Sequence, residues 1–294
     1  MLIEVEDGTD FQRKQITAEL MRVCKRLDKL PVPIRIHEVI VAKDIVETVN
    51  RLQGTTSAFL SRITRSSNIV PVGKLVELDG LIYIILSSTL FATEHDAQTR
   101  SFVLVHEVGH LINKRSFPNH DLSADRVYLH LLYTLYDEYL ADFNAYKMVD
   151  MLFPKKSAIW QNRLYDSSLD FMKIASDPAL LQEIRSNARK FQGHRNMDLF
   201  LSKTNEIIET IAIAITHLFA NTDYQGLRAS DFVDPESTFI NEHTFALMDD
   251  FRMAAEQGRF DVHEYKSDIA DFLTNFGVFY TDTQSGLFCK ITEI

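Results

Sequence analysis

The five residues His106-Glu107-Val108-Gly109-His110 constrain the fold of this chain more than any other segment. They lie in an apolar stretch, 102–112, whose pattern predicts an α-helix beginning near Thr93. Residues four apart share one face of a helix, so both imidazoles point to the same side, one turn apart. Such a pair can bind one metal ion, with Glu107 close to a water molecule on that ion. The string also arises by chance, so its context must support it.

A zinc ion in an enzyme has three protein ligands and one open position. A third histidine six residues after His110 is excluded, because Ser116 stands there. A glutamate on the next helix is the alternative, and Glu138 lies within the helical pattern 123–152. Asp142 follows one turn later on the same face, where it can accept the ring N–H of a ligating histidine. The competing interpretation is that both acids belong to a solvated acidic face.

Three other histidines are weaker candidates for the metal site. His120 lies in an expected loop, and His130 lies two turns before Glu138. His37 begins a similar string that lacks its second histidine and falls in an expected strand. The simpler interpretation of His37 is a histidine of the core or surface.

The composition excludes several classes of protein. With 294 residues and 46% hydrophobic side chains, the chain can form one large or two modest domains. A net charge of −10 argues against direct nucleic-acid binding, which needs clustered Lys and Arg. Cys24 and Cys289 are too few and too far apart to suggest a disulfide framework.

The sequence also predicts no membrane partner and a cytoplasmic location. The first ten residues, MLIEVEDGTD, are acidic and lack the apolar core of a signal peptide. The most apolar stretch, 207–219, contains Glu209 and His217 and is shorter than the ~20 residues that span a bilayer. A buried helix is the better interpretation of this stretch.

The remaining patterns predict an α+β fold. Apolar spacing indicates helices over 16–30 and 43–52, and alternation indicates a strand over 34–42. Asp79-Gly80 joins the apolar runs 75–78 and 81–87 as the favoured two-residue turn of a β-hairpin. The later chain is mostly helical, with helices over 166–192, 198–220, 240–257 and 261–276, and a final hairpin after Gly277.

Two segments resemble the ImmA/IrrE family of gluzincin-type zinc metallopeptidases. They are TRSFVLVHEVGHLI at 99–112 and EYLADFNAY at 138–146, and MLFP at 151–154 is similar to the end of that family's second helix. The resemblance covers about residues 10–154. It departs from the family in the long segment between His110 and Glu138, with the insert 116–123, and in the lack of a preceding helix-turn-helix.

The resemblance implies a zincin-like catalytic domain over 1–154, with a small mixed sheet, a hairpin at its edge, the histidine helix and the glutamate helix. It implies one Zn²⁺ per chain held by His106, His110 and Glu138, with Glu107 catalytic and Asp142 behind a histidine. Strand 81–87 would then border the site and pair with an extended substrate, or be an ordinary sheet strand. Residues 155–294 are expected to form a mostly helical regulatory or substrate-holding region that ends in a hairpin.

We therefore expect a zinc-dependent endopeptidase, a hydrolase acting on a specific protein substrate. The resemblance implies DNA-binding repressors of phage, mobile-element or stress systems as substrates. One alternative is a catalytically inactive zinc-binding interaction module of the same fold. Another is a helical adaptor without a metal, in which the motif at His106 is accidental.

Overall fold

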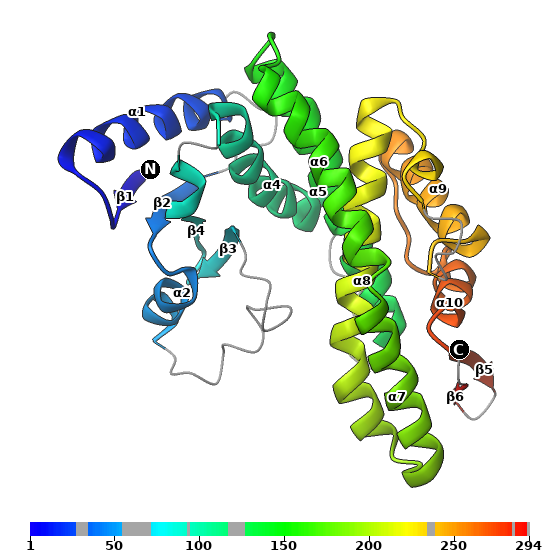
Figure 1. The fold of residues 1–294 in the computed structure, drawn as a ribbon. Coiled ribbons are helices and arrows are strands. Elements are labelled where there is room, and N and C mark those ends of the chain that lie inside the picture. Colours follow the sequence, from blue (N-terminus) through cyan, green and yellow to red (C-terminus); the bar gives the residue numbers. More distant parts are fainter. Residues whose placement is uncertain are drawn as a thin grey trace. The chain divides into compact units, whose positions relative to one another are not determined.

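The computed structural model describes residues 1–27, 35–54, 72–92, 95–116, 127–233, 239–283 and 286–292. Figure 1 shows the course of the chain and the labels of its elements. These elements follow in the order β1 (Leu2–Val5), α1 (Asp10–Leu27), β2 (Ile36–Ala42), α2 (Ile45–Gln53), β3 (Gly73–Leu78), β4 (Leu81–Ser87), the 3-10 helix η2 (Ser88–Phe91), α4 (Ala97–Ser116), α5 (Val127–Leu152), α6 (Ala158–Ala175), α7 (Pro178–His194), α8 (Met197–Gln225), the 3-10 helix η3 (Ala229–Asp231), α9 (Glu242–Gln257), α10 (Lys266–Thr274), β5 (Val278–Thr283) and β6 (Gly286–Ile291). The predicted α+β class is confirmed. Within the described ranges, no helix is both long and apolar enough to cross a membrane.

The chain divides into two compact units. The first comprises Met1–Ser116 and Ala141–Tyr165, and the second comprises Phe117–Leu140 and Asp166–Ile294. Helix α5 contributes its residues up to Leu140 to the second unit and those from Ala141 to the first. The boundary predicted after residue 154 falls between α5 and α6.

The first unit contains a mixed sheet whose described strands have the order β1-β2-β4-β3. The pairs β1-β2 and β2-β4 are parallel, and β3-β4 is antiparallel. The predicted hairpin turn is present, with φ of 50° at Asp79 and 74° at Gly80, as this turn type requires. Strand β4 has partners on both sides, so of the two alternatives for 81–87 the ordinary sheet strand applies, and this strand has no free edge for a substrate. Among the described strands, β3 is the edge strand on that side.

Helices cover both faces of this sheet (Figure 1). Val39, Val41 and Ile84 pack in one core with residues of α1, α4 and the second half of α5. Ile40 and Ile85 face the opposite way and pack with α2. Successive residues of a strand point to opposite faces, so a strand covered on both faces is apolar throughout.

Two helix boundaries differ from their prediction for local chemical reasons. Asp96 caps α4, because the backbone N–H of Thr99 donates to its Oδ1 at 2.9 Å. Thr93, which was expected to begin this helix, lies outside the described residues. The predicted helix 166–192 is wrong, since α6 ends at Ala175 and α7 begins at Pro178. Proline cannot continue the hydrogen bonds of a helix interior, but it fits a first helical position.

The second unit is built from helices and a hairpin. Tyr136 on α5 stacks on Phe260 with ring centroids 3.8 Å apart, and its ring also meets Phe251 of α9 edge to face. The predicted final hairpin is confirmed as β5 and β6, which pair antiparallel. Gly277, with φ of 71°, precedes it.

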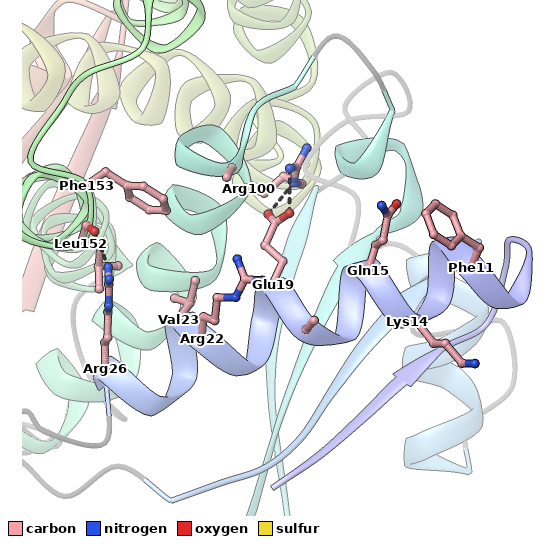
Figure 2. A pocket seen from close by; sticks show the side chains of 12 residues that line it. Phe11, Lys14, Gln15, Glu19, Arg22, Val23, Arg26, Arg100, Leu152 and Phe153 are labelled. Atoms are coloured by element: carbon pink, nitrogen blue, oxygen red, sulfur yellow. Dashed lines mark hydrogen bonds and ion pairs between the residues drawn. The ribbon is translucent and has the colours of Figure 1, made fainter.

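A basic groove of about 770 Å³ lies on the first unit between α1, the start of α4 and the end of α5 (Figure 2). Its lining includes Lys14, Arg22, Arg26 and Arg100, against one acid, Glu19. Arg100 binds Glu19 through two hydrogen bonds of 2.7 and 2.8 Å, marked in Figure 2. His106, His110 and Glu138 do not line this groove.

Within the first unit, α4 and α5 approach closely at Gly109 and Ala141. A Cβ atom added to Gly109 would lie 3.0 Å from Cα and 3.2 Å from Cβ of Ala141. The glycine therefore lets the two backbones come together, although glycine costs ~1 kcal/mol of helix propensity relative to alanine. Gly109 and Ala141 therefore form the contact between the two helices.

We predict that Gly109→Ala lowers the free energy of unfolding by up to about 2 kcal/mol. Overpacking costs ~1–3 kcal/mol, and the gain in helix propensity offsets only part of it. Gly193→Ala is the matched control, because nothing lies within 4 Å of the Cβ position at this exposed helical glycine. Denaturant titration followed by circular dichroism should show the control equal to or more stable than wild type. Equal stabilisation by both changes would contradict the role of Gly109 in packing.

Candidate metal centre

Helix α4 presents His106 and His110 together on one side. Their rings meet edge to face with centroids 4.6 Å apart, and their Nε2 atoms lie 3.0 Å apart. Two nitrogens bound to one tetrahedral zinc ion at ~2.0–2.1 Å would be separated by about 3.3 Å. The separation of the two Nε2 atoms is therefore close to the value expected if both nitrogens bind one ion.

Glu138 on α5 completes the group. His106, His110 and Glu138 each offer one ligand atom, and these atoms all lie within 4.8 Å of one another. Glu138 is 3% exposed, which excludes the solvated acidic face considered as its alternative. A buried carboxylate needs a cation or hydrogen-bond donors. The three residues can therefore hold a metal ion.

Asp142 lies one turn after Glu138 and contacts the other side of His106. Its Oδ1 is 2.7 Å from His106 Nδ1, and Asp142 is 2% exposed. A carboxylate cannot donate, so Nδ1 carries the proton in this bond. In the neutral ring, Nε2 is then left without a proton and directed toward the group, as a metal ligand must be.

Glu107 is buried beside the histidines and lies outside the set of three ligands. Strand β3 approaches it at Gly73, where an added Cβ would lie 2.8 Å from Glu107 Oε1 and 2.8 Å from a methyl group of Val103. Only a glycine leaves this space without displacing a side chain. The carboxylate of Glu107 therefore lies next to the first residue of the edge strand.

The rival histidines are not part of this group. The ring of His37 on β2 meets Tyr83 of β4 edge to face, with centroids 5.3 Å apart. His130 is exposed on α5, and His120 lies outside the described residues.

The tyrosines of α5 mainly serve packing. Tyr146 stacks on Phe102 of α4 with centroids 4.5 Å apart. Tyr139 donates a hydrogen bond of 2.6 Å to Asp223 of α8 within the second unit. Burial and the Asp223 carboxylate raise the pKa of Tyr139 above its usual range, so this phenol is a neutral donor.

The sequence prediction missed His217. Its Nε2 lies 3.9 Å from Glu138 Oε2, and its side chain is 16% exposed. His217 is the one ionisable residue of the apolar stretch 210–220, and this unusual position could have marked it as a candidate functional residue. The prediction used that residue only as an argument against a membrane span.

A comparison of the chain with protein families, curated proteins and solved structures returns no match.

We predict about one equivalent of tightly bound Zn²⁺ per chain, lost in His106→Ala, His110→Ala and Glu138→Ala. Each change removes one of three ligands, and the affinity of such a site depends on all of them. Elemental analysis of each purified variant measures the occupancy. His130→Ala is the control, because it removes an exposed histidine from the same helix as Glu138. Full occupancy in Glu138→Ala would refute its assignment as third ligand.

Asp142→Asn is predicted to weaken zinc affinity by ~10–100-fold while the chain stays folded. The amide keeps the size of the side chain but is a poorer acceptor for the His106 Nδ1–H. Competition with a chromophoric chelator gives the affinity, and circular dichroism checks the fold. Unchanged affinity would show that the 2.7 Å contact has no part in holding the metal.

Proposed function

We propose that this protein is a zinc-dependent endopeptidase that hydrolyses peptide bonds of a specific protein substrate. One observation carries the proposal: a carboxylate, Glu107, stands next to the first of two histidines that converge with Glu138 on one point. Two histidines and a glutamate are a donor set of catalytic zinc sites, which keep one position open. The resemblance to ImmA/IrrE metallopeptidases supports the same assignment.

The proposed chemistry divides between the ion and the chain. A bound zinc ion would lower the pKa of a water molecule towards ~7 and polarise a substrate carbonyl. Glu107 acts as the general base that takes the proton of this water as it attacks the peptide carbon. The same carboxyl group then delivers the proton to the departing amine. Asp142 holds the His106 ring in the orientation that ligation needs throughout.

The edge strand β3 supports an extended peptide as substrate. An unpaired strand edge offers N–H and C=O groups to which a peptide can add as a further strand. In the described part of the chain, β3 pairs only with β4, and its first residue, Gly73, borders Glu107. A peptide on this edge would therefore lie beside the general base. We therefore propose β3, and not 81–87, as the strand to which the substrate adds.

The resemblance adds DNA-binding repressors as the first substrates to test. The runner-up function is a catalytically inactive zinc-binding interaction module, and the third is a helical adaptor without metal. The presence of Glu107 favours the enzyme over the inactive module, because a pure binding site has no use for a base beside its ligands. The burial of Glu138 among the ligand atoms favours both over the adaptor.

Glu107→Gln is predicted to retain zinc and fold while losing at least ~100-fold in peptide hydrolysis, since the amide cannot accept the proton. The zinc-loaded wild type and variant should be incubated with a proteome-derived peptide mixture and with candidate repressors. Mass spectrometry then identifies the bonds that are cut.

The control is Glu183→Gln, the same change at an exposed position of α7. It should cleave like wild type. Equal cleavage by Glu107→Gln would exclude Glu107 as the base. Zinc binding without cleavage of any substrate by the wild type would favour the inactive module.

A further inference from the structure

We propose that His217 of α8 is a positioning residue of the metal centre. Its Nε2–H donates to the Glu138 carboxylate and so fixes this glutamate as a ligand through a single oxygen. The inference rests on the proposed function, because it takes Glu138 to be a metal ligand. Glu138 and His217 both belong to the second unit.

The contact itself indicates the role. His217 Nε2 lies 3.9 Å from Glu138 Oε2, with 16% and 4% of the two side chains exposed. A shift of Glu138 Oε2 by about 1 Å towards His217 Nε2 would shorten their separation to the 2.7–3.2 Å of an N–H···O hydrogen bond. His217 is not a member of the group of ligand atoms within 4.8 Å of one another. His217 is therefore argued to act on Glu138 and not as a ligand itself.

Contacts with α6 hold the imidazole in this orientation. The His217 ring stacks on Phe171 with centroids 5.0 Å apart and 28° between the planes. One turn later on α8, Asn221 donates a buried hydrogen bond of 3.1 Å to Ser168 of α6. These two contacts fix both the rotation of α8 and the plane of the ring.

A further contact fixes α8 against α5. Tyr139, the residue after Glu138, donates to Asp223, which follows His217 by six residues on α8. The bond is 2.6 Å long, and burial raises the pKa of Asp223 above its usual value. The two helices are thus tied together beside the carboxylate that His217 faces.

The sequence makes a purely structural histidine costly at this point. His217 is the only ionisable residue in TIAIAITHLFA, 210–220, and the residues around it are mostly apolar and buried. An imidazole that is 16% exposed carries a desolvation cost there that leucine does not. A ligating carboxylate, by contrast, gains from a donor on its second oxygen, which prevents both oxygens from occupying the ion. This arrangement keeps the fourth position open for water.

The test compares His217→Leu and His217→Gln in the full-length protein. The glutamine amide nitrogen can reach nearly the place of Nε2 and retains an N–H donor, whereas leucine keeps the bulk alone. We expect zinc affinity, measured by chelator competition, to fall ~10–100-fold in His217→Leu and to stay within about threefold of wild type in His217→Gln. In the Co²⁺-substituted protein, the visible absorption bands should shift in the leucine variant and recover in the glutamine variant.

Controls separate this role from others. His130→Leu, an exposed position of α5, should change neither affinity nor spectrum. The metal-free leucine variant should unfold at the same denaturant concentration as wild type or higher, which a merely structural histidine would not allow. Unchanged affinity and spectrum in His217→Leu would overturn the inference, as would equal weakening by glutamine and leucine. Loss of zinc as complete as in Glu138→Ala would make His217 a ligand instead.

A failure of the inference about His217 can be distinguished from a failure of the proposed function. If the wild type binds no zinc, the metal centre itself is refuted. If Glu138→Ala loses zinc but both His217 variants match the wild type, the centre stands and only the role of His217 is refuted. The affinity and the Co²⁺ spectrum also decide the matter if no substrate is cleaved.

Discussion

The close approach of α4 and α5 at Gly109 and Ala141 is the constraint on which the contact between Asp142 and His106 in the candidate metal centre depends. Helices usually pack with axes 8–10 Å apart, and the distance depends on the side chains at their contact. Where a glycine meets an alanine, short side chains can bridge from one helix to the other. Asp142, the residue after Ala141, can therefore reach His106 with a carboxylate only two bonds from the backbone.

Much of this arrangement is encoded in local spacing and was predictable. The positions of His106 and His110, four residues apart, and of Glu138 and Asp142, also four apart, need only the geometry of a helix. The hairpin at Asp79-Gly80 was equally accessible, because two residues with positive φ define its turn. In each case the signal lies within one turn or one hairpin, so no knowledge of the tertiary structure is needed.

The remaining features depend on residues distant in sequence, and local patterns do not report these. Strand β1 has only four residues and too little alternation to be recognised. The interior place of β4 follows from its parallel pairing with β2, which is more than 30 residues earlier in the chain. The approach of Gly73 to Glu107, and of His217 to Glu138, likewise joins segments with no shared motif. Only the fold brings these residues to the site.

The edge strand β3 also raises the question of how copies of this chain avoid aggregating through their sheets. An open strand edge can recruit another copy as readily as a peptide, and natural sheets counter this with short, charged edges. Strand β3 has six residues, and Lys74 and Glu77 supply charges along it. Glu77 is further engaged by Lys114 of α4 at 2.7 Å. The opposite edge, β1, has four residues and carries Glu4. Short edges with charged side chains disfavour continuous pairing of two sheets, so the protein can keep an edge available to a peptide without polymerising through it.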